Sequence, residues 1–130
     1  MMTSPQRIGI AVVEHAGRYL VGIRPNGVPL AGYAEFPGGK CHAGEPTDIC
    51  AVRECREETG LAVTPVRLLQ EVTHTYPHGT VELAFWLCGP VDDAVAAEHQ
   101  GYRWVTAGQL AELRFPDANA AVIALLLSGA

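Results

Sequence analysis

The amino-acid sequence predicts a domain of the α/β class. Its length of 130 residues is typical of a single domain, and its hydrophobic content of 48% is ample for a core. Segments expected to form strands alternate along the chain with two or three segments of helical character. We therefore expect one domain over residues 1–130, built from strands and helices.

The N-terminal third is expected to begin with a pair of strands. Residues 7–13 and 18–24 are apolar enough to form them, and His15-Ala16-Gly17 provides a short turn between them. Residues 25–32 are rich in proline and glycine and are predicted to form a loop.

The first helix is predicted over residues 47–59. Thr47 is a reasonable N-cap, and Asp48 in the first turn suits the positive end of the helix dipole. Gly60 follows as a natural terminator, because it adopts the left-handed conformation without strain.

A second hairpin and two further helices complete the predicted domain. Strands are expected over residues 66–75 and 80–88, with a turn at Pro77-His78-Gly79. A short strand over residues 101–105 follows. Two helices then end the chain: one capped by Thr106 and running to about Leu113, and one running from Pro116 or Asp117 to about Leu127.

The first predicted helix carries carboxylates on one face. At about 100° per residue, Glu54, Glu57 and Glu58 share an arc of about 100°. Like charges at this spacing repel one another. A cation above them would relieve the repulsion, and Mg²⁺ takes carboxylate oxygens and bridges to substrate phosphates. The alternative is a solvated acidic face with Arg53 and Arg56 as partners.

The loop before this helix contains two adjacent glycines in Glu35-Phe36-Pro37-Gly38-Gly39-Lys40. Glycines let the backbone approach a phosphate or a metal closely, and Lys40 adds a positive charge. The segment is not a Walker A loop, because Ala34 and Cys41 stand where that motif needs glycine and a hydroxyl residue.

The loop and the helix together resemble a known family. The fixed positions of the Nudix box are met by Gly39, Glu45, Arg53-Glu54, Glu57-Glu58 and Gly60 with an apolar residue after it. Cys55 is a mild departure, because that apolar position is more often aliphatic. Residues 35–40 and 114–119 are also similar to segments of MutT-type members. The chain is thus identified as a member of the Nudix family, which implies an α/β/α sandwich with a mixed β-sheet.

The resemblance also implies roles for particular residues. Mg²⁺, with Mn²⁺ as a substitute, would be held by Glu54, Glu57, Glu58, Glu98 and the Gly38 carbonyl, with Arg53, Lys40 and Glu45 in support and Arg24, Phe36 and Asn119 contacting substrate. Either Glu54 or Glu98 would act as the general base. Glu98 could instead be a solvated loop carboxylate, and Asn119 a helix cap.

The implied reaction is hydrolysis of a nucleoside triphosphate to the monophosphate and pyrophosphate, with an oxidised purine nucleotide such as 8-oxo-dGTP as substrate. The carboxamide of Asn119 offers a donor and an acceptor side by side, which matches the edge of 8-oxoguanine but also that of adenine. The alternatives are CTP or dCTP, an adenine nucleotide, a nucleoside diphosphate derivative, or a nucleotide sensor without catalysis.

Composition and short apolar runs limit which binding partners and which cellular location are expected. The net charge of −5 argues against polymeric DNA or RNA, whose phosphates demand basic surface. The apolar runs 8–13 and 122–127 are too short to cross a membrane. The four cysteines contain no C-x-x-C pair and are expected to be reduced, and Pro77 argues against a zinc pair at His74 and His78. We expect a cytoplasmic monomer or homodimer.

Overall fold

The protein is described by a computed structural model that covers residues 5–77 and 79–129. The strands are β1 (Gln6–His15), β2 (Arg18–Ile23), β3 (Ala34–Glu35), β4 (Gly38–Lys40), β5 (Val63–Tyr76), β6 (Gly79–Pro90), β7 (Glu98–His99) and β8 (Tyr102–Thr106). The helices are α1 (Thr47–Thr59), α2 (Ala107–Glu112) and α3 (Ala120–Leu127), and a 3₁₀ turn (Asp117–Asn119) precedes α3.

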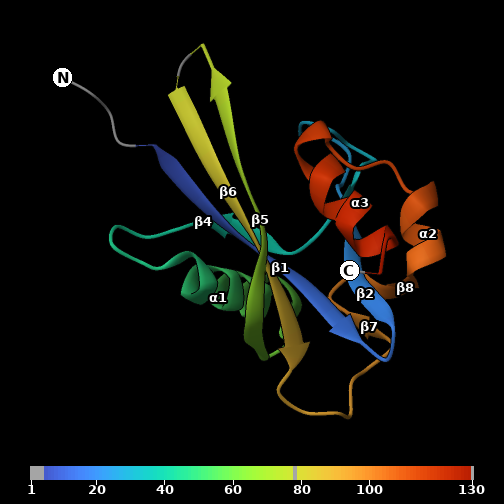
Figure 1. Ribbon diagram of the computed structural model, residues 1–130. Helices are drawn as coiled ribbons and strands as arrows, with labels where there is room; N and C mark the ends of the chain where they lie inside the picture. Colours follow the sequence, from blue (N-terminus) through green and yellow to red (C-terminus); the bar gives the residue numbers. More distant parts are fainter. Residues whose placement is uncertain (1–4, 78, 130) are drawn as a thin grey trace.

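The sheet is mixed, as expected. Its strand order is β5-β6-β1-β2-β8-β7, with β3 paired to β2 and β4 paired to β1. The β1 and β6 strands are parallel, whereas β1 runs antiparallel to both β2 and β4. Helix α1 lies on one side of β1, and α2 and α3 lie on the other (Figure 1).

Alternation along β1 divides the core into two layers. Ile10 and Val12 belong to the cluster that contains Leu110 of α2 and Val122 of α3. The intervening residues, such as Ala11, belong to the cluster beneath α1. Because successive side chains of a strand point to opposite faces, one strand supplies both layers. The α/β/α sandwich is thereby confirmed.

Helix α1 packs unusually close to β1. A Cβ atom added to Gly9 would lie 2.5 Å from the Thr47 carbonyl oxygen and 2.8 Å from the Ala51 backbone nitrogen. Any larger residue at this position would push the helix away from the sheet. Gly9 therefore sets how near the face of α1 that carries Glu54, Glu57 and Glu58, the glutamate face, comes to β4. Strand β4 is the neighbour of β1.

The boundaries of the helices confirm some predictions and correct one. Gly60 ends α1 with a φ of 76°, and Thr106 caps α2 in a capping box with Gln109. The predicted N-cap Thr47 is wrong: Pro46 occupies the cap position, and Thr47 is the first helical residue. The Thr47 hydroxyl instead accepts a hydrogen bond of 3.0 Å from the indole nitrogen of Trp86. The predicted turn at residues 77–79 includes His78, which lies outside the described residues.

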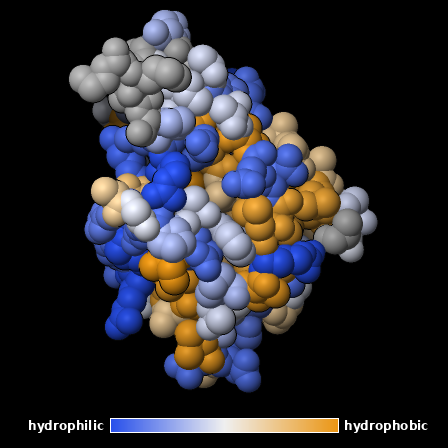
Figure 2. Space-filling view, turned by 60° about the vertical axis from the view of Figure 1, so that its left-hand side comes forward, coloured by the Kyte–Doolittle hydropathy of each residue, from blue (hydrophilic) through white to orange (hydrophobic). Residues whose placement is uncertain are grey.

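The surface combines polar and apolar residues. On the face drawn in Figure 2, hydrophilic residues dominate the left-hand part and apolar atoms gather toward the right. Exposed large apolar residues occur on several elements: Ile23, Val28, Leu30, Ile49, Val66, Leu68, Val91 and Leu127. In the described part of the chain, no helix is both long and apolar enough to cross a membrane.

Candidate functional site

The glutamate face of α1 lies against the two glycines of β4. A Cβ atom added to Gly39 would lie 2.4 Å from the carboxyl carbon of Glu54. The clash is steric, since the Glu54 carboxyl group occupies the space where a side chain would stand. Gly39 therefore allows the Glu54 carboxylate to reach the backbone of β4.

Arg53 holds this region together with several hydrogen bonds. Its Nε and Nη2 atoms donate to the two carboxylate oxygens of Glu45, at 2.8 and 2.9 Å. Its Nη1 atom donates to Glu57 at 2.6 Å and to Glu54 at 3.2 Å, and Nη2 also donates to the Lys40 carbonyl at 3.0 Å. The paired hydrogen bonds from Arg53 lower the pKa of Glu45 to about 2. Arg53 thus links α1 to the loop that contains Glu45.

Glu58 has a different environment from the other glutamates of this face. The Gly38 N–H donates to its Oε2 atom at 2.8 Å, and the Tyr102 hydroxyl lies 3.4 Å from its Oε1 atom. Among the described residues, no arginine or lysine pairs with it. Burial raises its pKa to about 7, and the charges of Glu54 and Glu35 contribute in the same direction. Ionised Glu58 therefore has neutral hydrogen-bond donors as its partners.

Glu35 and Tyr102 lie in the site, although neither was among the residues predicted from the sequence. The Tyr102 hydroxyl lies 3.3 Å from Glu35 Oε2, and Arg24 pairs with Glu35 Oε1 at 3.1 Å. Burial, followed by the charges of Glu58 and Glu35, raises the pKa of Tyr102. Glu35 belongs to the glycine-containing segment 35–40, and its place in that segment is a sequence signal for a role in the site. Nothing local marks Tyr102, which reaches Glu58 across 44 positions of sequence.

A cavity of about 470 Å³ opens beside these groups. Its lining comprises Ile8, Ile10, Arg24, Leu30, Glu35, Phe36, Gly38, Gly39, Lys40, Pro116 and Asn119. Asn119 is only 8% exposed, and its side chain makes no capping hydrogen bond with α3. The alternative in which Asn119 serves as a helix cap is therefore not supported by its side-chain contacts. Phe36 stacks on Phe115 with ring centroids 5.0 Å apart, which fixes one wall of the cavity.

The predicted residues are not all brought together. Glu54, Glu57 and Glu58 share one face of α1, and Lys40 and Asn119 both line the cavity. Glu98 is an exposed residue of the edge strand β7, where it lies opposite Arg103 in the antiparallel register of β7 and β8. Among the described residues, no hydrogen bond or ion pair connects Glu98 to the α1 glutamates. Gly38 contacts Glu58 through its N–H, and the role of its carbonyl as a metal ligand stays a prediction.

The donor set fits a hard divalent cation. Carboxylate oxygens are the ligands that Mg²⁺ prefers, and three carboxyl groups lie on this face of α1. Arg53 contacts two of them, while the partners of Glu58 within the described part of the chain are the neutral N–H of Gly38 and the Tyr102 hydroxyl. A divalent cation would supply the positive charge that the partly buried Glu58 lacks.

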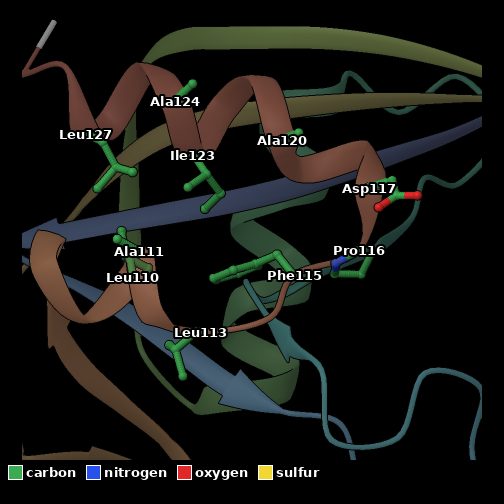
Figure 3. A pocket seen from close by; sticks show the side chains of 10 residues that line it. All are labelled: Leu110, Ala111, Leu113, Phe115, Pro116, Asp117, Ala120, Ile123, Ala124 and Leu127. Carbon is green, nitrogen blue, oxygen red and sulfur yellow. The ribbon is translucent and has the colours of Figure 1, made fainter.

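A second cavity, of about 380 Å³, lies between α2 and α3 and is lined mainly by apolar side chains. In Figure 3, Leu110 and Ile123 project into the space between the two helices, whereas Asp117 lies at one end. Only Pro116 is shared with the first cavity. With no convergent polar groups, this second cavity is not the candidate for phosphate chemistry.

Comparison with known proteins agrees with the geometry. The NUDIX domain family model matches residues 9–125. The chain is 34% identical over 98 residues to the 8-oxo-dGTP diphosphatase of Escherichia coli K12, covering 75% of this chain and 76% of that protein. It is 30% identical over 111 residues to the CTP pyrophosphohydrolase of the same organism, covering 85% and 81%.

A solved structure of similar size extends the match to the fold. A MutT structure from work on Aliivibrio salmonicida and Vibrio cholerae superposes with a TM-score of 0.74 at 26% identity, covering 95% of this chain and 96% of that one. The family model spans most of the chain, including the glycines of β4 and the glutamates of α1. This chain belongs to the Nudix family of hydrolases.

Proposed function

We propose that this hydrolase is a Mg²⁺-dependent nucleoside triphosphate pyrophosphohydrolase that cleaves oxidised purine nucleotides such as 8-oxo-dGTP. One observation carries the proposal: a single cavity extends from Gly38 and Gly39, beside the α1 glutamates, to the buried Asn119. A triphosphate could lie at the glycine end while its base reaches the carboxamide. Action in the cytoplasm, as a monomer or homodimer, is part of this proposal.

Glu54, Glu57 and Glu58 would hold Mg²⁺, or Mn²⁺ in its place, together with the Gly38 carbonyl. When bound, the ion would neutralise charge on the phosphates and activate water for attack on phosphorus. Arg53 keeps the Glu54 and Glu57 carboxylates in position through its hydrogen bonds.

Two carboxylates remain candidates for the general base. Glu54 is supported by its place against Gly39, within the carboxylate cluster. Glu98 would have to approach from the edge of the sheet. Lys40 lines the cavity beside the glycines, where its charge would offset that of the phosphates.

Asn119 is proposed to read the base. Oxidation of guanine at C8 places a proton on N7, so the edge offers an acceptor and a donor that match one carboxamide. Unmodified guanine presents two acceptors there, one of which would oppose the carboxamide oxygen. Because Asn119 is buried, an unmatched edge leaves a polar group without a partner, which is costly.

The experiment compares kcat/KM for 8-oxo-dGTP and dGTP in the wild type, Asn119→Ala and Asn26→Ala. Asn26 is exposed and does not line the cavity, so it controls for the loss of an amide elsewhere. The wild type and the control should prefer 8-oxo-dGTP, by as much as about 10⁴-fold if the site is tightly matched. Asn119→Ala should lose most of that preference but still hydrolyse nucleotide. An Asn119→Ala enzyme with the full preference would contradict base reading by this residue.

A second candidate substrate is CTP or dCTP, favoured by the similarity to a CTP pyrophosphohydrolase. The same assay should therefore include cytidine and adenine triphosphates and a nucleoside diphosphate derivative. A wild type that prefers one of these over 8-oxo-dGTP would replace the proposed substrate. Absence of Mg²⁺-dependent hydrolysis of any nucleotide, with binding retained, would favour the nucleotide sensor.

A further inference from the structure

The register of β4 brings two cysteines to the same place. The Cys41 N–H donates to the Arg7 carbonyl at 2.9 Å, which continues the pairing of β4 with β1 by one residue. Because strand side chains alternate between faces, Cys41 shares its face with Gly39, which meets Glu54 of α1. Cys50 lies one helical turn before Glu54 on the same side of α1. The helix therefore presents Cys50 toward Cys41.

A carboxylate completes this group. One ligand atom each from Cys41, Glu45 and Cys50 lies within 4.8 Å of the other two. Within residues 5–77 and 79–129, this is the one group of three or more histidine, cysteine or acidic side chains that meets so closely. Cys50 is buried and Cys41 is half-buried, and the Cys50 thiol lies 3.3 Å from the Gly39 carbonyl oxygen.

Glu45 still has a free position for a ligand. Arg53 donates one hydrogen bond to each carboxylate oxygen, and the His42 N–H donates a further one to Oε1 at 2.9 Å. A carboxylate has about four acceptor positions, so one remains on Oε2. Two thiolates and Glu45 around a divalent ion would carry one net negative charge, and the Arg53 guanidinium lies next to it, bound to Glu45.

The donor chemistry differs from that of the α1 glutamates. Thiolates select soft ions such as zinc, whereas Mg²⁺ prefers oxygen ligands. Zinc binds sulfur at about 2.3 Å and carboxylate oxygen at about 2.0–2.2 Å, usually with four ligands. We propose that Cys41, Cys50 and Glu45 form a binding site for a thiophilic divalent ion such as zinc, separate from the Mg²⁺ site and with water as the fourth ligand. Binding would displace both thiol protons to solvent.

Such an ion would tie β4 to the start of α1. Cys41 directly follows Lys40 of β4, Cys50 lies in the first turns of α1, and Glu45 comes from the loop between them. The end of β4, the connecting loop and the start of α1 would then be held by a single centre. Because the unfolded chain lacks this arrangement, the bound ion should stabilise the folded protein by mass action.

The test is a titration of the reduced, full-length enzyme with Cd²⁺ in a large excess of Mg²⁺. Cadmium reports thiolate ligation directly through its ultraviolet charge-transfer absorption, and the excess Mg²⁺ occupies the oxygen ligands of α1. The variants are Cys41→Ala and Cys88→Ala, which each remove one thiol. Cys88 is a buried cysteine outside the cluster and serves as the matched control.

The wild type and Cys88→Ala should develop the absorption with one equivalent of Cd²⁺, and Zn²⁺ should compete for it. Loss of an outer partner of a metal ligand costs about 10–100-fold in affinity, so removal of a ligand should cost at least about 100-fold in Cys41→Ala. Equal Cd²⁺ affinity in Cys41→Ala and wild type would overturn the proposal, as would displacement of Cd²⁺ by Mg²⁺. A thermal shift with Zn²⁺ that survives in Cys41→Ala would overturn it too. None of these measurements depends on hydrolysis.

Discussion

Replacing Glu58 by glutamine should stabilise the metal-free enzyme at neutral and alkaline pH. The side chain keeps its shape and can still accept the hydrogen bond from the Gly38 N–H. What disappears is a negative charge that is partly buried and lies near Glu54 and Glu35. The same substitution removes a proposed metal ligand, so its effect on stability should be opposite to its effect on activity.

The pH dependence follows from the raised pKa. Folding moves the pKa of Glu58 from its ordinary 4.5 to about 7, so the folded state binds this proton more tightly than the unfolded state. The resulting stability is fully present below about pH 4.5 and is lost as the pH rises through about 7. Glutamine does not titrate. The free energy of unfolding of the variant should therefore rise relative to that of the wild type across this window, and the difference should stay constant at higher pH.

The magnitude is bounded by the size of the shift. A shift of this size corresponds to roughly 3 kcal/mol at about 1.4 kcal/mol per pKa unit. Glu58 is only partly buried, and water screens the remaining part of its charge. We therefore expect the free energy of unfolding of Glu58→Gln to exceed that of the wild type by about 1–2 kcal/mol at pH 8, with little difference at pH 4.5.

The assay is urea unfolding in the presence of a chelator at several pH values from 4.5 to 8. With a typical slope of about 1–3 kcal/mol per molar urea, the midpoint should rise by roughly 0.5–1 M at pH 8. Glu112→Gln removes the same charge from an exposed position on α2 and serves as the control. Added Mg²⁺ should stabilise the wild type more than Glu58→Gln, because the ion offsets the charge that the variant lacks.

Two results would refute this reasoning. One is a metal-free Glu58→Gln protein that is less stable than the wild type at pH 8. The other is a difference between them that does not change from pH 4.5 to pH 8. Either would mean that the contacts of Glu58 with Gly38 and Tyr102 outweigh the cost of burying its charge.

Three further predictions concern catalysis. Glu57→Gln should lower kcat by at least about 10²-fold in saturating Mg²⁺ while the fold is retained, since it removes a charged metal ligand; steady-state rates near those of the wild type would exclude this role. If Glu54 is the base, the acid limb of the pH–rate profile should vanish in Glu54→Gln and persist in Glu98→Gln, and the reverse result would assign the role to Glu98. Gly39→Ala should displace the Glu54 carboxylate and abolish most activity, whereas Gly89→Ala, where a Cβ has open space, should leave kcat/KM unchanged.

The longer elements of the fold could be predicted because their patterns are local. The apolar run of β1 and the cap at Thr106 are each contained within a few consecutive residues. Strands β3, β4 and β7 were not foreseen, because two or three residues are too short to show a period. The N-cap was misassigned for a related reason. The Thr47 hydroxyl is engaged by Trp86, 39 positions away, and nothing near Thr47 indicates that contact.

The residues of the candidate site also fall into those that local sequence patterns predict and those that depend on long-range contacts. The spacing of Glu54, Glu57 and Glu58 was sufficient to place them on one face of a helix. The sequence could not show that Tyr102 and Glu35 adjoin Glu58, because these contacts depend on how β8 and the segment from β3 to β4 meet α1. Two residues that set the charge environment of the site therefore became visible only in the structure.

The structure also weakens the alternative in which the acidic face of α1 is merely solvated and paired with arginines. Arg53 does pair with Glu54 and Glu57, but its remaining hydrogen bonds are used by Glu45 and the Lys40 carbonyl. Arg56 is exposed and, among the described residues, makes no ion pair with these glutamates. Glu58 is thus left with neutral donors in a partly buried position, where its charge is costly. A face built only for solvation gains nothing by burying a carboxylate, whereas a divalent cation bound at this face would offset the charge that burial penalises.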